Sequence, residues 1–313
     1  MKRKGLAVGL PLLAVSLVLS GCSLFQTGSN QPGDGTGDDP APSPSAPPPE
    51  LPRGGREIFP EYRLFGYSGL EGAPALGRLY GDLDAVGAQI ERVGARYAGG
   101  RKVLPVYELI TVLVMGSPGT DGMYRVRQSD KLVRRYLNAA RRDKALLLLD
   151  IQPGRSDFLP ELKHYEKFLK EPDVGVALDP EWAMDPDEVP IRDGYGNSSG
   201  KELNEVAEYL SEIVAQYDLP EKVMVFHQVA PYVVAKPKAL KPHEGVVIIR
   251  SVDGIGSPSA KTYTWNVLTK NQPKYIHAGF KLFYEEDVAT GGVLMTPKQV
   301  LKLRPQPEYI LIE

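Results

Sequence analysis

Short apolar runs recur along the chain beyond residue 60, and they predict the strands of a sheet. Several of them, such as the run that ends in Leu-Leu-Leu-Leu-Asp-Ile at residue 151, are continuously apolar instead of alternating. Continuous runs suit strands that are buried on both faces, as in a parallel sheet covered by helices. The eight predicted strands are 62–67, 103–110, 145–151, 174–178, 223–227, 246–252, 276–283 and 309–312.

Segments with helical periodicity lie between these runs. The clearest has apolar residues at alternating spacings of three and four, from Leu76 to Tyr97, and it ends at Gly99-Gly100. A capping-box pattern at Ser199-x-x-Glu202 predicts the start of another helix. We also expect helices over 130–142, 157–170 and 259–269, and one that begins at Thr296-Pro297.

Eight strands that alternate with helices predict an α/β fold, a (β/α)8 TIM-type barrel. Two departures are expected. The segment 234–244 contains helix-breaking residues and is predicted to lack a full fifth helix, and the chain stops at Glu313, which leaves no eighth helix. The alternative is an open doubly wound sheet, although the glycine-rich dinucleotide turn of one kind of open sheet is absent.

Charge and composition exclude several classes of function. Lys and Arg total 37 and Asp and Glu total 39, for a net charge of −2, which argues against a nucleic-acid partner. A single cysteine excludes a disulfide framework and a cysteine-based zinc site. The four histidines show no HExxH pair, so the sequence predicts no cofactor and does not favour a metal centre.

The first residues have the organisation of an export signal. Lys2, Arg3 and Lys4 precede an apolar run over 6–19, which is too short for an ordinary transmembrane helix. The sequence Leu19-Ser20-Gly21-Cys22 then resembles the lipobox of bacterial lipoproteins. This resemblance implies a signal peptide over 1–21, lipidation of Cys22, and a membrane-anchored location on the extracytoplasmic face.

The next segment has the composition of a tether. Residues 22–56 are rich in Pro, Gly, Ser and Asp, and they cannot bury enough apolar area to offset the cost of ordering. We therefore expect a disordered tether over 22–56 and a barrel domain over 57–313.

Polar residues end most of the predicted strands, and in TIM barrels functional groups lie at the carboxyl ends of strands. The most informative stretch is Asp179-Pro180-Glu181-Trp182. On a continuing strand Asp179 and Glu181 face the same side, and Asp150 on the neighbouring strand is a partner carboxylate. Two carboxylates that flank a glycosidic bond are the groups that glycoside hydrolysis requires. The candidate catalytic residues are therefore Glu181, Asp179 and Asp150.

Other polar and aromatic residues near the strand ends are candidate substrate contacts. Trp182 and Tyr67 are expected to stack on sugar rings, and His227 and Gln228 to bind substrate hydroxyl groups. Lys281 lies on an apolar strand and needs a carboxylate partner, for which Asp150, Glu108 and Asp253 are candidates. The full set of predicted substrate-binding residues is Tyr67, Glu108, Gln152, Arg155, Trp182, His227, Gln228, Asp253, Lys281 and Tyr284.

Several segments carry a resemblance to known proteins. The stretches LDIQPGRSDF (149–158), LDPEW (178–182) and GFKLFYEED (279–287), with 226–228 and 252–256, resemble bacterial lipoproteins and secreted proteins, notably of actinobacteria. That group has no assigned reaction, so the resemblance implies fold and export. More broadly, the layout is similar to glycoside-hydrolase TIM barrels, although the chitinase-type DxxDxDxE strand is absent.

Three functions remain open from sequence. The first is an extracytoplasmic glycosidase that acts on cell-wall or extracellular polysaccharide, with Glu181 as general acid and Asp150 or Asp179 as base or nucleophile. The second is a non-catalytic lipoprotein that binds glycan or another envelope component in the same cleft. The third is a hydrolase that holds a divalent cation on Asp150, Asp179, Glu181 and Asp253. The oligomeric state is not predicted.

Overall fold

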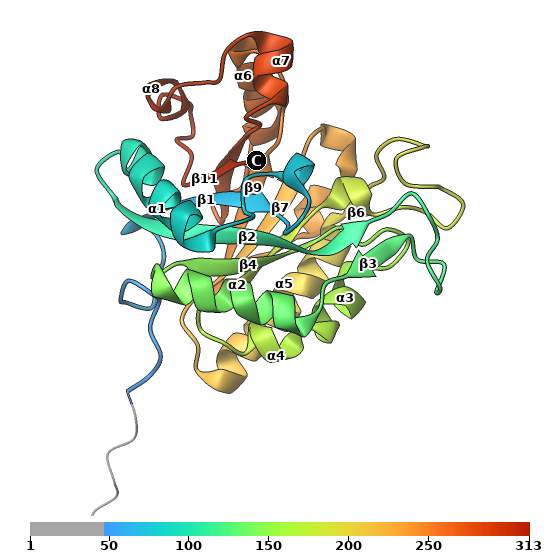
Figure 1. Cartoon of the computed structure of the whole chain (residues 1–313), viewed down its shortest axis with the longest axis horizontal. Helices are drawn as coiled ribbons and strands as arrows, with labels where there is room; N and C mark the ends of the chain where they lie inside the picture. Colours follow the sequence, from blue (N-terminus) through green and yellow to red (C-terminus); the bar gives the residue numbers. More distant parts are fainter. Residues whose placement is uncertain (1–46) are drawn as a thin grey trace, which may run out of the picture. The chain divides into compact units, whose positions relative to one another are not determined.

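The computed structural model describes residues 47–313, so the predicted signal peptide, Cys22 and the tether up to residue 46 lie outside the described residues. Eight parallel strands form a closed barrel, because β1 pairs with both β2 and β11 (Figure 1). The strands, in the order in which they pair around the barrel, are β1 (Tyr62–Gly69), β11 (Tyr309–Ile312), β10 (Ile276–Leu282), β9 (Val246–Val252), β7 (Lys222–Gln228), β5 (Val174–Leu178), β4 (Leu146–Ile151) and β2 (Lys102–Val114). The predicted TIM-type barrel is confirmed, and the open sheet is wrong.

Helices connect the strands and cover the outside of the barrel. They are α1 (Leu83–Gly94), α2 (Asp130–Arg142), α3 (Phe158–His164), α4 (Glu166–Leu169), α5 (Gly200–Tyr217), α6 (Pro258–Thr269), α7 (Glu286–Gly291) and α8 (Pro297–Val300). Three short strands lie outside the barrel: β3 (Arg125–Arg127), β6 (Ser198–Ser199) and β8 (Val234–Ala235). Among the described residues, no helix combines the length and apolarity needed to span a membrane.

Two helices are shorter than their periodicity predicts. The helix expected from Leu76 begins at Leu83, because Gly77 and Gly81 have positive φ angles and Asp82 caps the backbone N–H groups of the first turn. The helix expected over 157–170 is divided into α3 and α4 at Tyr165. Between β7 and β9 the chain forms two 3₁₀ turns and β8, so the expected loss of a full fifth helix is confirmed.

Alternation along the strands creates two cores. Leu104, Val106, Leu148 and Ile249 belong to a cluster of strand residues that fills the barrel interior. The intervening residues, such as Leu147, pack against helix residues in the layer between the barrel and the helices. Side chains of a strand point alternately to its two faces. Every second residue of a strand therefore belongs to the barrel interior, and the residues between them belong to the outer layer.

The segment before β1 belongs to the folded domain. Leu51 is 3% exposed, and the Arg53 guanidinium donates a hydrogen bond of 2.9 Å to the carbonyl oxygen of Val103. Arg56 donates to the carbonyl oxygen of Leu219 at 2.9 Å. The predicted boundary at residue 57 is therefore too late, because one buried leucine and two arginines attach residues 51–56 to the barrel.

Candidate functional site

The inward-facing positions of the strands change from apolar to polar at their carboxyl ends. On β4, Leu146 and Leu148 are followed by Asp150, and on β7 Val223 and Val225 are followed by His227. The same inward-facing alternation brings polar residues from seven strands together at the carboxyl-terminal opening of the barrel, which we call the mouth. They are Glu108, Asp150, Asp179, His227, Asp253, Lys281 and Glu313, and all except Glu313 are buried. The structure thus brings together most of the polar residues proposed from sequence.

His227 and Asp253 form the centre of this mouth. The imidazole Nδ1 of His227 lies 2.8 Å from Oδ2 of Asp253, and Ser251 donates to the other carboxylate oxygen at 2.7 Å. Lys281 lies 3.5 Å from Asp253 and 2.5 Å from Glu313. His227 and Lys281 outweigh the effect of burial and hold the pKa of Asp253 at about 2. Asp253 is therefore ionised at neutral pH.

Glu108 lies on the other side of the His227 ring. Its Oε1 atom is 3.3 Å from Nε2 of His227, and Tyr309 donates a hydrogen bond of 2.8 Å to its Oε2 atom. Burial lowers the pKa of His227, but the carboxylates of Asp253 and Glu108 outweigh it and raise that pKa well above its usual value. The ring is thus held between two acids.

Among the residues that the structure describes, three further carboxyl groups in the mouth form no salt bridge. Burial raises the pKa of Glu181 to about 8, and the carboxylates of Asp179 and Asp253 act in the same direction. Burial also raises the pKa of Asp179 to about 6. The pKa of Asp150 lies well above its usual value, through burial first and then the charges of Asp179 and Glu108. Carboxyl groups outnumber basic groups here, so some of them retain protons at neutral pH.

Glu181 and Asp179 are positioned by the short turn that follows β5. Pro180–Trp182 form a 3₁₀ turn, and the backbone N–H of Gly196 donates to the carbonyl oxygen of Glu181 at 2.8 Å. Gln152 donates to Oδ2 of Asp179 at 3.1 Å and accepts from the N–H of Val114. Gln152 therefore orients a carboxylate of the site.

Unpartnered polar atoms concentrate in the mouth. Within residues 47–313, four of its buried atoms make no hydrogen bond: Glu108 Oε1, Asp150 Oδ1, Glu181 Oε2 and His227 Nε2. Glu108 Oε1 and His227 Nε2 contact each other at 3.3 Å without hydrogen-bond geometry. Buried polar atoms in native proteins are nearly always paired with protein, water or ligand. Their convergence in one place is typical of a site that binds something.

A metal ion is one group that these residues could hold. Asp150, Asp179 and His227 each offer one ligand atom, and these atoms all lie within 4.8 Å of one another. The Nδ1 contact of His227 with Asp253 is the outer-shell arrangement common for metal-bound histidines. Sequence reasoning proposed the two aspartates for a cation but not His227.

Aromatic side chains border the mouth. Trp182 packs edge-on against Tyr195, with ring centroids 5.7 Å apart, and the Tyr195 side chain is 45% exposed. The Arg78 guanidinium lies 4.3 Å from the centre of the Tyr284 ring. Arg78, Tyr284 and Glu313 line a cavity of about 400 Å³ beside β1. Flat apolar rings beside buried carboxyl groups are suited to binding sugars.

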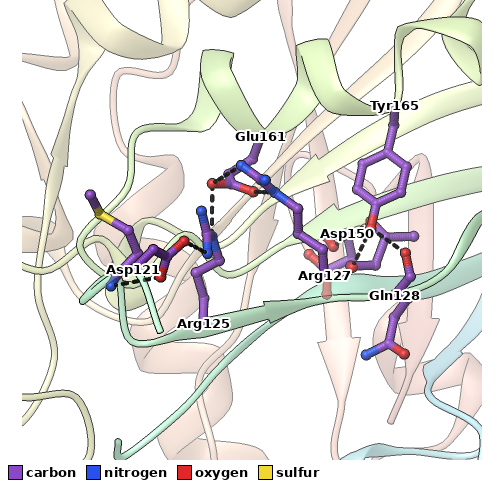
Figure 2. Close-up of polar contacts among 9 residues, drawn as sticks. Asp121, Arg125, Arg127, Gln128, Asp150, Glu161 and Tyr165 are labelled. Carbon is purple, nitrogen blue, oxygen red and sulfur yellow. Dashed lines mark hydrogen bonds and ion pairs between the residues drawn. The ribbon is translucent and has the colours of Figure 1, made fainter. Parts of the chain in front are cut away.

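The chain turns back after β2, and β3 pairs antiparallel with the end of β2. We call this hairpin, residues 112–128, the wall above β2. Figure 2 shows Glu161 of α3 between Arg125 and Arg127 of β3, which it contacts at 2.8 and 2.5 Å. The same view shows Tyr165, whose hydroxyl group donates to the carbonyl oxygen of Gln128 at 2.8 Å. Glu161 is fully buried, so this ion-pair cluster fixes the wall to the barrel.

Three residues proposed as substrate contacts lie elsewhere. Tyr67 points outward and packs in the layer between barrel and helices, edge-on to Phe65. Gln228 also points outward, and its amide donates to the carbonyl oxygen of Ala230. Arg155 lies 4.2 Å from the Tyr124 ring centre and donates to the carbonyl oxygen of Glu188 at 2.8 Å, so it joins two loops. The structure therefore does not bring these three side chains into the carboxylate mouth, because nearness to a strand end does not specify a face.

Sequence reasoning also missed members of the site. Tyr309, Ser251 and Glu313 contact Glu108, Asp253 and Lys281, respectively. The alternation along each strand could have identified them, because it predicts which residues face inward. Tyr309, Leu311 and Glu313, for example, follow one another at intervals of two. A search for charged residues alone passes over the tyrosine and the serine.

Comparisons with known proteins add little to this picture. No protein-family model and no curated protein sequence matches the chain. Among solved structures, the chain is similar to the crystal structure of dihydropteroate synthase from Anaplasma phagocytophilum with bound 6-hydroxymethylpterin-monophosphate. That similarity has a TM-score of 0.34 at 10% identity, and covers 80% of this chain and 92% of that one. Similarity at this level carries no information on the function of this chain.

Proposed function

We propose that this chain is a lipid-anchored, extracytoplasmic glycan hydrolase that uses carboxyl groups at the mouth of its TIM barrel. The observation that supports this most is that Glu181 and Asp179 are both buried at the mouth, 6% and 5% exposed, where burial raises the pKa of Glu181 to about 8 and that of Asp179 to about 6. Different pKa values on neighbouring carboxyl groups are what separates an acid from a base in glycoside hydrolysis.

The roles follow from protonation at neutral pH. Glu181 retains its proton and donates it to the glycosidic oxygen as the bond to the anomeric carbon breaks. Asp179 is largely ionised and serves as the second carboxylate, which activates water or attacks the anomeric carbon. Gln152 holds Asp179 in place, and Trp182 with Tyr195 provides the surface on which a sugar ring stacks.

The location is inferred from the amino terminus. The lipobox-like Leu19-Ser20-Gly21-Cys22 and the Pro/Gly-rich stretch after it support anchoring through a lipidated Cys22. Incorporation of labelled palmitate into the full chain, and its loss in Cys22→Ala, is the expected result. Equal labelling of the variant would reject the anchor.

Glycan turnover by the full-length protein tests the proposed activity. A panel of cell-wall and extracellular polysaccharides is incubated with wild type, Glu181→Gln and Glu212→Gln, the last being an exposed control on α5. Release of reducing ends by wild type and Glu212→Gln, but not by Glu181→Gln, supports the proposal. Binding without turnover by folded wild type would instead support a non-catalytic glycan-binding protein.

A second candidate, a divalent-metal-dependent hydrolase, is favoured by the convergence of Asp150, Asp179 and His227. Ligands of mixed oxygen and nitrogen type suit Zn²⁺ or Mn²⁺. Turnover measured with and without a chelator separates the two candidates. Loss of turnover on chelation and its recovery with added Zn²⁺ or Mn²⁺ would establish the metal-dependent reaction.

A further inference from the structure

A second cavity lies on the outer wall of the barrel, away from the carboxylate mouth. It has a volume of about 260 Å³ and lies between strands β7 and β9, the end of α6 and the segment before β10. A barrel of this type normally carries a helix after β7, and here that connection contains only two 3₁₀ turns and the two-residue strand β8. Because this connection lacks a full helix, the outer surface of the barrel is left uncovered at this point.

Its lining is basic. Arg250, Lys238 and Lys270 line the cavity, and no lining residue is Asp or Glu. Within residues 47–313, none of these three side chains forms a salt bridge. The chain as a whole has slightly more acids than bases, so a cavity lined by three cations and no acid is a local concentration of positive charge.

Arg250 is the central feature, because it is a buried cation for which residues 47–313 provide no counter-ion. It is 6% exposed, and burial lowers the pKa of its guanidinium to about 10. Its Nη1 atom donates to the carbonyl oxygen of Leu268 and to the side-chain oxygen of Gln272. Both acceptors are neutral, and an unpaired buried charge is strongly unfavourable in a folded protein.

One edge of the Arg250 guanidinium is unused. Within the described part of the chain, no hydrogen bond reaches Nε, which is buried, and none reaches Nη2. The Nε–Nη2 edge of an arginine is the fork that binds two oxygens of one phosphate or carboxylate. Gln228, which also lines the cavity, has a buried side-chain oxygen without a donor.

We propose that this cavity binds a small organic phosphate. The phosphate oxygens pair with the free edge of Arg250, and Lys238 and Lys270 contribute charge at the entrance, where both are exposed. A hydroxyl group of the ligand donates to Gln228. The apolar side chains of Leu268 and Ile276 line the cavity beside these groups, which suits the carbon skeleton of such a molecule.

Glycerol 3-phosphate is the probe, and isothermal titration with the full-length protein is the measurement. Inorganic phosphate and glycerol are tested beside it, to separate the contribution of the anion from that of the hydroxyl groups. Vesicles that contain phosphatidylglycerol distinguish a lipid headgroup from a free phosphate ester. We expect glycerol 3-phosphate to bind, phosphate to bind more weakly, and glycerol not to bind.

Two variants locate the site. Arg250→Met removes the charge at similar volume, and we expect it to weaken binding about 10- to 100-fold, since a hydrogen bond between charged groups is lost. Lys274→Met is the matched control, because Lys274 is an exposed lysine of the same segment that does not line the cavity. We expect it to bind as wild type does.

Two results would overturn the proposal, and the expected binding pattern would support it. The proposal is overturned if wild type binds none of the phosphate probes at 10 mM, or if Arg250→Met binds as tightly as Lys274→Met. Unfolding temperatures without ligand verify that Arg250→Met is folded. If it is not, Lys270→Met, whose side chain is exposed, replaces it against the same control. The assay does not involve glycan turnover, so its result is independent of the mouth.

Discussion

The Nδ1 atom of His227 lies 2.8 Å from Oδ2 of Asp253, and both side chains are almost completely buried inside the barrel. Lys281 is 3.5 Å from the same carboxylate oxygen. One ionised carboxylate thus serves two buried basic groups. The site depends on this group for its charge balance, which makes Asp253 the residue whose loss is most informative.

Substitution of Asp253 by Asn is expected to lower the free energy of unfolding by about 3 kcal/mol at pH 7, because it leaves His227 and Lys281 buried with one acid fewer. The folded-state pKa of Asp253, about 2, is below its usual value. Its stabilisation is therefore fully present above about pH 4 and is lost as the pH falls towards 2. Urea unfolding from pH 2 to 7 measures this, with the exposed Asp187→Asn as control. A difference from wild type that is independent of pH would contradict the assignment.

Glu181 should give the opposite dependence on pH. Its folded-state pKa of about 8 is above the usual value near 4.5, so the folded protein binds the proton more tightly than the unfolded chain. Stability from this group is fully present below pH 4.5 and falls by up to about 1.4 kcal/mol per pH unit until about pH 8. Urea unfolding of Glu181→Gln should therefore show less loss of stability with rising pH than wild type, whereas Glu212→Gln should follow wild type. Parallel curves for wild type and Glu181→Gln would show that Glu181 titrates normally.

The wall above β2 depends on Glu161. Replacement by Gln leaves Arg125 and Arg127 without their shared carboxylate, and we expect a loss of about 3 kcal/mol in the free energy of unfolding. Asp121→Asn removes only the partly exposed end of the same cluster and should cost less than about 1 kcal/mol. Limited proteolysis should show faster cleavage within 115–128 in Glu161→Gln alone. Equal cleavage in both variants would remove Glu161 as the anchor.

Trp182 should contribute to glycan affinity without affecting the fold. Its side chain is partly exposed beside Tyr195, and loss of one stacking surface is worth roughly 1 kcal/mol, or about fivefold in Kd. Affinity for the best substrate of the panel, measured on the inactive Glu181→Gln background, should fall by this factor in Trp182→Ala. Tyr263→Ala is the control, because that side chain is 71% exposed on α6. Unchanged affinity in Trp182→Ala would place the sugar elsewhere.

The barrel, and the identity of most polar groups in its mouth, can be predicted from the amino-acid sequence. Continuous apolar runs can be buried only between two apolar layers, so the strands are found within a few residues of their prediction. Polar residues at strand ends, as in Leu149-Asp150 and Phe226-His227, could be recognised because an ionisable residue after an apolar run is unusual. Helix lengths were less predictable. The apolar periodicity begins at Leu76, but Gly77 and Gly81 have positive φ angles, so helix α1 begins only at Leu83.

Which of these groups contact one another depends on how the strands are arranged in space, and the contacts in turn set the properties of each group. Tyr67 and Gln228 lie at strand ends like their neighbours, yet the alternation along their strands directs them to the outer layer. The pairing of Asp253 with His227, and the lack of a carboxylate partner for Arg250 within the described part of the chain, depend on the order in which strands close the barrel. Burial then sets the pKa values, because the cost of a charge depends on the surrounding groups and solvent, which residues distant in the chain supply.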